Sequence, residues 1–241
     1  MRPIERGDSP IAGDFANYRD AFAELVSRLG SYCSYCERRI PTQLAVEHIQ
    51  PKAEGLYPHL VGRWDNYLLG CVNCNSTKGD KDVQLDRVLL PDRDNTSAAL
   101  IYAADGTVEI HPEISQICRP MAELALSIPG LDKPISEVFD ANGRLVAIDR
   151  VGQRMEIWAI AEVSKEDLAT LPSDVMRRQI VKTALASGCF SIWITVFADD
   201  PVMRRLLIDG FPGTAQSCFD ADTTVLRSPR ESNGLAHAGK V

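Results

Sequence analysis

Near the start of the chain, apolar residues are spaced as on one face of a helix. They recur three and four positions apart over residues 14–29, which predicts an amphipathic helix with Asp14 as its N-cap and Gly30 as its C-cap. Residues 44–51 (LAVEHIQP) follow the two-residue period of a strand. The run 66–81 (NYLLGCVNCNSTKGDK) is apolar at first and leads into a second helix. This part of the chain therefore mixes helical and extended elements.

The pattern changes after residue 90. Residues 100–110 (LIYAADGTVEI) alternate around an Asp-Gly turn, which predicts a β-hairpin. The short apolar run 191–197 (SIWITVF) fits either a buried strand or a helix, because periodicity does not separate the two. From residue 228 onward the sequence is polar and predicts disorder. Helical patterns cover residues 114–128, 150–169, 173–187 and 201–211.

These patterns predict an α+β protein in three parts. We expect a compact module at residues 1–90, a mostly helical region with a small hairpin at 91–227, and a disordered tail at 228–241. Hydrophobic residues make up 45% of the chain and charged residues 24%, as in ordinary globular proteins. No run of about 18 apolar residues occurs, and the first residues lack an apolar signal core. We therefore expect a cytoplasmic protein that does not bind membranes.

Four of the seven cysteines form two Cys-x-x-Cys pairs, and the reducing cytosol favours metal binding over disulfides. Four thiolates complete a closed tetrahedral zinc site, which is structural because no position remains for water. The 34 residues between the pairs exceed the gap of a simple zinc ribbon, so another element must be inserted there. Core cysteines or a redox pair are the alternatives. The predicted zinc ligands are Cys33, Cys36, Cys71 and Cys74.

The other three cysteines stand alone in mostly apolar segments. Isolated cysteines of this kind usually behave as small buried hydrophobic side chains. We therefore assign no chemistry to Cys118, Cys189 and Cys218.

Four polar residues lie inside or just after the gap between the cysteine pairs: Glu47, His48, Asn66 and Asn75. Singly they have simpler explanations, as a core histidine, a turn residue or a helix cap. Together they suit phosphodiester hydrolysis, which needs a base to activate water and a divalent ion to hold the phosphate. A neutral imidazole is such a base near pH 7. A carboxylate with an amide oxygen suits Mg²⁺, and the cysteine pairs bring Asn75 back beside Glu47.

The segments VEHIQPK, WDNYLLGC and VNCNSTKGDK resemble the HNH endonucleases and their ββα-metal motif. The resemblance covers residues 33–81 and implies that His48 is the general base and that Asn66 braces the loop between the strands. It also implies that Glu47 and Asn75 bind the catalytic Mg²⁺ or Mn²⁺. Many members carry His at the last position, and Asn there favours an oxygen-loving metal. The expected fold is thus a zinc-stapled ββα-metal module with a mostly helical C-terminal region.

A wider resemblance spans most of the chain. The opening RPIERG, the cysteine-rich region and the late segments FSIWITVFADDPVMRRLL and GFPGTAQSCFD are similar to the HNH component of Septu and retron-associated anti-phage systems. That resemblance implies an ABC-type ATPase partner. Residues 91–227 offer helices but no recognisable catalytic set, so we expect the partner to dock mainly there. A free-standing restriction- or repair-type HNH enzyme is the alternative.

Charge also indicates that the protein does not act on nucleic acid alone. The net charge is −7, with 11 basic and 12 acidic residues up to residue 90, and 15 basic and 21 acidic residues after it. Proteins that hold DNA by themselves usually present a basic face, because neutralised phosphates release counterions. Lys52 and Lys78 flank the predicted centre and are candidates for phosphate contacts, although lysines beside loops are usually only solvated.

The sequence therefore predicts an HNH endonuclease that cleaves DNA within a defence complex. An RNA or tRNA nuclease built on the same motif is a second possibility. A zinc-ribbon module that only binds a partner is a third, but such a module has no need of Glu47, His48, Asn66 and Asn75 in this arrangement.

Overall fold

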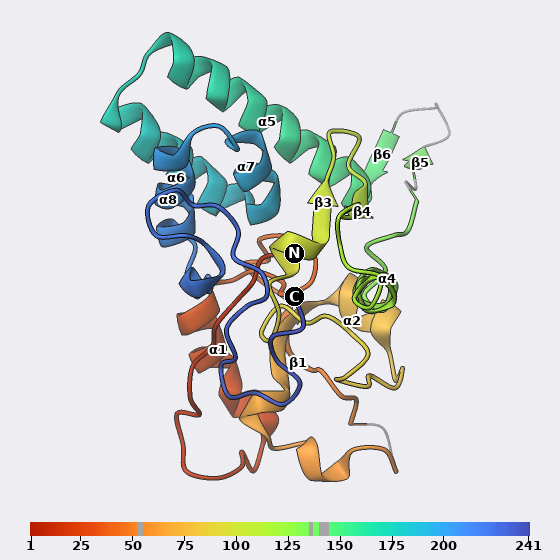
Figure 1. Cartoon of the computed structure of the whole chain (residues 1–241). Helices are drawn as coiled ribbons and strands as arrows, with labels where there is room; N and C mark the ends of the chain where they lie inside the picture. The colour runs from red at the N-terminus through yellow and green to blue at the C-terminus, as the bar shows by residue number, and fades with distance from the viewer. Residues whose placement is uncertain (53–54, 135–136, 140–144) are drawn as a thin grey trace.

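The computed structural model describes residues 1–52, 55–134, 137–139 and 145–241. Within these residues the strands form two-stranded antiparallel sheets, and helices surround them (Figure 1). The strands are β1 Leu44–His48, β2 Tyr67–Cys71, β3 Leu100–Tyr102, β4 Val108–Ile110, β5 Glu137–Phe139 and β6 Leu145–Ile148. The helices are α1 Phe22–Leu29, α2 Val72–Lys78, α3 Thr96–Ala99, α4 Arg119–Ser127, α5 Arg150–Thr170, α6 Asp174–Ser187, α7 Phe190–Val196 and α8 Pro201–Gly210. Short 3₁₀ helices cover Tyr18–Ala21, Pro58–Leu60, Trp64–Asn66 and Gln216–Cys218.

The predicted strand and the apolar run after it pair as a β-hairpin. β1 and β2 are antiparallel, with Leu44 opposite Cys71 and His48 opposite Tyr67. Every residue of β2 is buried, so the hairpin has one strand inside the core and one at its edge. Helix α2 begins at Val72, directly after β2, and this places the second cysteine pair at a strand-to-helix junction.

The first predicted helix is shorter than its pattern suggests. It begins with the 3₁₀ turn at Tyr18, capped by the Asn17 side chain, rather than at Asp14. The reason is tertiary: Phe15 N donates to Gly62 O at 2.9 Å, and this backbone contact holds the preceding residues against the β1–β2 connection. The helix ends at Gly30 as expected, with a φ of 74° that favours glycine.

The ambiguous run 191–197 is helical. Gly188 ends α6 with a φ of 79°, and α7 then begins after Cys189, whose own φ is 53°. Trp193 is fully buried in α7, and its Nε1 donates to Gly188 O at 3.1 Å. Most of the helix lies inside the core and only Thr195 is exposed, so the run lacks the broad polar face by which a surface helix is recognised.

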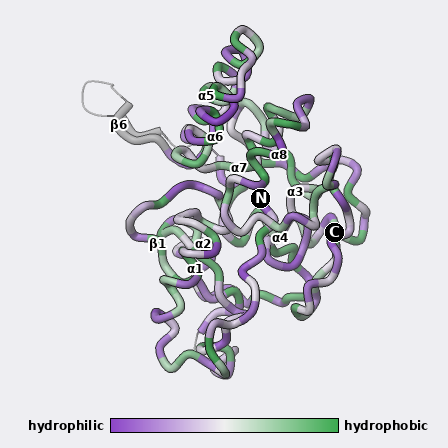
Figure 2. The backbone as a smooth tube through the Cα atoms, turned by 90° about the vertical axis from the view of Figure 1, so that its left-hand side faces the viewer, coloured by the Kyte–Doolittle hydropathy of each residue, from purple (hydrophilic) through white to green (hydrophobic). Residues whose placement is uncertain are grey.

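Helices α5 and α6 form a long hairpin that projects from the body of the molecule (Figure 1). Hydrophobic and hydrophilic residues alternate along both helices (Figure 2). The predicted β3–β4 hairpin is confirmed, with Tyr102 opposite Val108. Within the described part of the chain, no helix has the length and apolarity that crossing a membrane requires.

The segments on either side of residue 90 share one hydrophobic core. Buried residues from both belong to a single cluster. At the contact between them, Cys189 N donates to Glu37 O at 2.9 Å, and Tyr32 OH donates to Leu185 O at 2.7 Å. The loop that carries the first cysteine pair is therefore packed directly against the α6–α7 turn.

The carboxyl-terminal segment differs from the expected disorder at 228–241. Val241 is buried, and its carbonyl accepts hydrogen bonds from Asn95 N at 2.7 Å and Arg230 N at 3.1 Å. The Lys240 ammonium lies 3.0 Å from the fully buried carboxylate of Asp94. Arg230, Asn233 and Lys240 from this segment bond to the body of the protein, and composition alone does not reveal such partners.

Candidate functional site

The four paired cysteines converge on one point. Their side chains are buried, and their sulfur atoms all lie within 4.8 Å of one another. All four are free thiols, and Cys36 Sγ lies 3.7 Å from Cys71 Sγ. A tetrahedral ion with Zn–S bonds of about 2.3 Å places its sulfurs roughly 3.8 Å apart. The donor set and the spacing both fit zinc, so the four residues form the closed zinc site that the sequence predicts.

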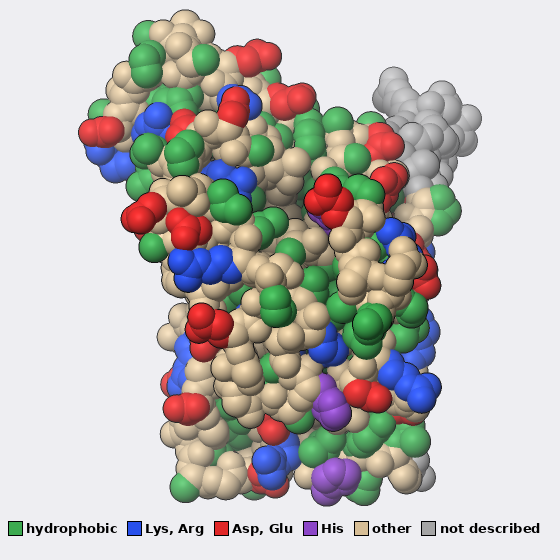
Figure 3. All heavy atoms as spheres, in the orientation of Figure 1, with side chains coloured by type: hydrophobic (Ala, Val, Ile, Leu, Met, Phe, Trp, Pro, Cys, Tyr) green, Lys and Arg blue, Asp and Glu red, His purple; other side chains and the backbone are tan. Residues whose placement is uncertain are grey.

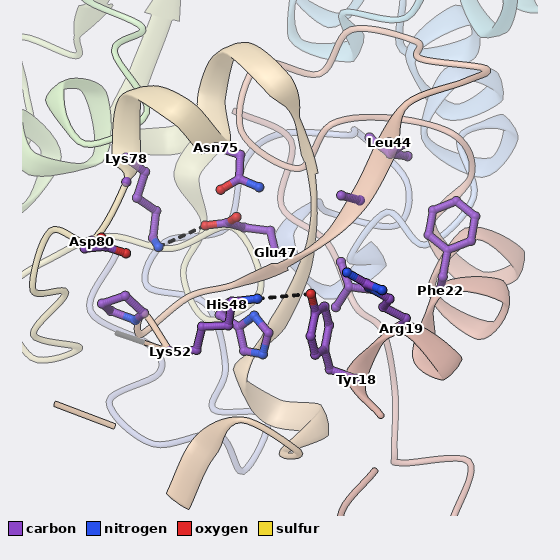
Figure 4. A pocket seen from close by; sticks show the side chains of 14 residues that line it. Tyr18, Arg19, Phe22, Leu44, Glu47, His48, Lys52, Asn75, Lys78 and Asp80 are labelled. Carbon is purple, nitrogen blue, oxygen red and sulfur yellow. Dashed lines mark hydrogen bonds and ion pairs between the residues drawn. The ribbon is translucent and has the colours of Figure 1, made fainter. Parts of the chain in front are cut away.

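Beside the zinc site lies a pocket of about 540 Å³. It opens between β1, α2 and the 3₁₀ turn at Tyr18–Ala21 (Figure 4). The predicted base and the two predicted metal ligands line it from the hairpin and helix: His48, Glu47 and Asn75. Lys52, Lys78 and Tyr18 line it as well. The ββα unit thus brings the predicted metal ligands and the predicted base into one cavity.

The His48 ring is buried at the end of β1, with an exposure of 6%. Its Nε2 lies 3.1 Å from the carbonyl oxygen of Val61. A carbonyl has no proton to give, so Nε2 is the donor and Nδ1 of the neutral ring is the acceptor. Burial lowers the pKa of His48, and Lys52 and Lys78 lower it further against the hydrogen bond to Val61. The imidazole is therefore held neutral in one tautomer.

Two aromatic rings fix the orientation of His48. The rings of Tyr18 and Tyr67 form T-shaped contacts with the imidazole, with ring centroids 4.8 Å and 5.2 Å away. Tyr18 also accepts a hydrogen bond from Lys52 Nζ at 3.0 Å. The sequence analysis did not identify Tyr18, because it lies on the helix before the first cysteine pair and no motif spacing links it to His48.

Glu47 is paired with Lys78 inside the pocket. Lys78 Nζ lies 2.9 Å from Glu47 Oε1, and both side chains are 3% exposed. Burial raises the pKa of Glu47, and the charge of Lys78 opposes that rise. The Glu47 carboxylate thus holds the Lys78 ammonium in this structure, and the contact of Lys78 with phosphate stays a prediction. Figure 4 shows Asn75 on the same helix, beside the Glu47 carboxylate.

A glycine makes room for Glu47. A Cβ at Gly70, on the neighbouring strand, would lie 3.0 Å from Glu47 Cβ and 3.6 Å from Glu47 Oε2. Carbon atoms in ordinary contact are about 3.5–4.0 Å apart, so a side chain at position 70 would press on the Glu47 Cβ atom and require Glu47 to shift. Sequence reasoning missed Gly70, since a glycine in a strand carries no chemical signal of its own.

Asn66 lies behind the pocket rather than in it. Its side chain accepts a hydrogen bond from Gln50 N at 2.8 Å and donates to Gln50 O at 3.0 Å. Its backbone carbonyl accepts from Ile49 N at 2.9 Å. The two residues that follow His48 are therefore fastened to Asn66, which is the arrangement expected of a brace for the loop.

Comparison with known proteins agrees with this geometry. The segment from Cys33 to Lys81 matches the HNH endonuclease family. Residues 33–81 are an HNH endonuclease domain. A further match is the Septu protein PtuB of Bacillus thuringiensis, which is 36% identical over 76 residues. That match covers 30% of this chain and 29% of the relative, so the chain spans less than a third of the relative's length.

The HNH domain does not contain the whole pocket. Tyr18 and Arg19 line the pocket from outside residues 33–81. The segment before the HNH domain therefore forms part of the pocket wall.

Proposed function

We propose that this chain is a divalent-metal-dependent endonuclease whose HNH domain hydrolyses phosphodiester bonds in DNA. The observation that supports this most directly is the pocket in which Glu47, His48 and Asn75 meet. A base, a carboxylate and an amide beside one cavity are the groups that metal-assisted hydrolysis of a phosphodiester needs.

His48 would act as the general base. The hydrogen bond from its Nε2 to Val61 leaves Nδ1 to accept the proton of the attacking water. Its lowered pKa keeps the ring unprotonated at neutral pH. Tyr18 and Tyr67 keep the ring plane in place while substrate binds.

Glu47 and Asn75 would hold the catalytic metal. Their oxygen atoms suit a hard ion, and Glu47 already has a cation at its carboxylate in the form of the Lys78 ammonium. A bound Mg²⁺ or Mn²⁺ would supply Lewis-acid stabilisation of the phosphate and of the leaving oxygen. Lys52 is exposed at the pocket and is placed to meet the phosphate backbone, and Lys78 would become free to do so when it leaves Glu47.

The test is cleavage of plasmid DNA and of a structured RNA with Mg²⁺ or Mn²⁺, with His48→Ala as the matched control. We expect nicking of DNA by the wild-type chain and none by the variant. Cleavage of RNA alone would replace DNA with RNA as the substrate. Absence of cleavage by the chain and by its complexes would favour a zinc module that only binds a partner.

We further propose that the chain works in a Septu-type defence complex with an ABC-type ATPase. The local similarity to PtuB and the charge of the chain both support this. On the face shown in Figure 3, acidic and basic side chains are interspersed rather than gathered into a basic face. Weak attraction to phosphate means low affinity for DNA at physiological salt, and a partner that binds DNA would compensate.

Co-expression of the chain with a candidate ATPase, followed by size-exclusion chromatography, tests this partner. We expect the two to co-elute, with contacts mainly through residues 91–227. Separate elution together with efficient DNA cleavage by the chain alone at physiological salt would favour a free-standing nuclease of the restriction or repair type.

A further inference from the structure

The zinc-site sulfurs are surrounded by N–H donors. Arg38 donates from Nε to Cys36 Sγ at 3.5 Å and from Nη2 to Cys71 Sγ at 3.4 Å. The backbone amide of Cys71 donates to Cys33 Sγ at 3.4 Å. Donors of this kind stabilise thiolates, and a guanidinium stabilises them more strongly because it is charged. One arginine of the HNH domain therefore donates hydrogen bonds to two of the sulfur atoms.

The fourth sulfur, that of Cys74, accepts a hydrogen bond from a residue outside the domain. Arg150, the first residue of α5, donates from Nη1 to Cys74 Sγ at 3.2 Å. The same guanidinium donates to Pro129 O at 2.8 Å and to Gly130 O at 2.5 Å. Three acceptors thus fix its orientation toward the sulfur. A Cβ at Gly130 would lie 3.2 Å from the Arg150 Nη2 atom, so the turn at this glycine fits closely around the arginine.

A second contact from α5 reaches the same cluster. Gln153, one turn after Arg150, accepts from Arg38 Nη1 at 2.8 Å through its Oε1 atom. Arg38 also donates to Asn73 Oδ1 at 3.1 Å, between the two cysteines of the second pair. The first turn of α5 is therefore joined to the zinc site through both arginines.

Charge explains why two arginines are present. Zn²⁺ with four thiolates carries a formal charge of −2, and the four sulfurs are buried. Buried charge is costly unless it is paired and hydrogen-bonded. Two guanidinium groups balance it, one from the HNH domain and one from α5.

We propose that the zinc site of this protein is completed by α5, with Arg150 and Arg38 neutralising the zinc–thiolate cluster. Binding of zinc and docking of the first turn of α5 then favour each other, because a coupling between two binding events is reciprocal. The HNH domain alone would retain zinc less firmly than the full chain. Through α5, the helical hairpin that projects from the body is connected to the metal that holds the nuclease module together.

The test measures zinc release from the full-length protein into an excess of a colorimetric chelator. Arg150→Met should release zinc about 10- to 100-fold faster than wild type, the usual effect of removing a group that supports a metal ligand. Arg150→Lys should fall between the two, because it keeps the charge but loses the forked geometry. Arg178→Met is the matched control, since Arg178 is exposed on α6 away from the cysteines, and it should leave the rate unchanged. Equal rates for Arg150→Met and wild type would overturn the proposal.

A measurement on the wild-type chain keeps the proposal testable if Arg150→Met does not fold. Removing zinc should increase amide hydrogen exchange at residues 151–153, whose N–H groups donate to Asp149 at the start of α5, more than at residues 168–171, at the end of the same helix. Unchanged exchange at the start of α5 would contradict the proposal. Neither readout depends on nuclease activity, so failure here is distinguishable from failure of the proposed function.

Discussion

The ammonium of Lys78 lies 2.9 Å from Oε1 of Glu47, and the two side chains are each 3% exposed. Glu47 is the carboxylate proposed to hold the catalytic metal, and the Lys78 ammonium supplies a positive charge directly beside it. Breaking a buried ion pair by removing one partner leaves an uncompensated charge, which usually costs about 3–5 kcal/mol. Lys78 is thus first a structural partner of Glu47, and it would have to leave this ion pair before it could contact phosphate.

Lys78→Met should therefore destabilise the metal-free site by about 3 kcal/mol, the lower end of that range, because burial already raises the pKa of Glu47 and favours its neutral form. Added Mn²⁺ should restore much of the loss by taking the place of the ammonium. Denaturant unfolding with and without Mn²⁺ measures both effects. Lys52→Met is the control, since Lys52 is exposed at the same pocket. Equal stability of Lys78→Met and wild type without added metal would show that the ion pair contributes nothing.

His48→Ala should abolish cleavage while leaving the fold and the zinc content intact. The variant loses the proposed base, and loss of a general base costs roughly 10²–10⁴-fold in rate. The zinc ligands lie elsewhere, at the two cysteine pairs. Plasmid nicking rates and metal analysis of the purified variant provide the two readouts. A variant that nicks DNA at the wild-type rate would mean that another group activates the water.

The zinc site and the meeting of Glu47, His48 and Asn75 at one pocket were predictable because their signals are local. Two Cys-x-x-Cys pairs have few uses in a reducing cell, and the spacing of the pairs requires the chain to return to one point. His48 and Asn75 follow from that return, since one lies inside the gap and the other directly after the last cysteine. The mixture of helices and strands and the β3–β4 hairpin were predictable from periodicity and turn residues, whereas the ββα-metal module also needed the cysteine pairs and the resemblance to HNH endonucleases.

The remaining features depend on contacts between distant parts of the chain. Arg150 and Cys74 are 76 residues apart, and no spacing rule joins an arginine at a helix start to a zinc ligand. The pairing of Lys78 with Glu47 and the contact of Tyr18 with His48 arise in the same way, from packing around the ββα unit. The order of the tail depends on the buried carboxylate of Asp94, which a composition-based argument does not include.

Gly70→Val should weaken binding of the catalytic metal without affecting zinc. The added side chain would push against Glu47, whose Cβ lies 3.0 Å from the position of the new Cβ. Displacing a ligand by this amount should raise the Kd for Mn²⁺ about 10-fold or more, on the scale seen when the support of a ligand is lost. Gly70→Ala should show a smaller effect in the same direction. Titration calorimetry with Mn²⁺ measures the series, and a wild-type Kd for Gly70→Val would refute the role given to this glycine.

Asn66→Asp tests whether Asn66 holds the loop after His48 in place through its hydrogen bonds to Gln50. Asn66 Nδ2 donates to Gln50 O at 3.0 Å, and a carboxylate at that position would replace the donor with a second acceptor. The partly buried carbonyl of Gln50 would lose its partner and face a negative charge, so the loop after His48 should shift. A displacement of about 1 Å in a catalytic group can cost 10²-fold in rate. We therefore expect kcat to fall by about 100-fold.

The affinity for the catalytic metal separates this role from direct ligation. Asn66 does not line the pocket, and its side chain is already engaged with both backbone groups of Gln50. The Kd of Asn66→Asp for Mn²⁺ should therefore stay close to the wild-type value while the rate at saturating metal falls. Asn75→Ala provides the opposite pattern for comparison: a raised Kd, with activity partly restored by excess Mn²⁺. If Asn66→Asp lost metal affinity and kept its rate at saturating metal, Asn66 would be a ligand and the geometry of the loop would have to rearrange on metal binding.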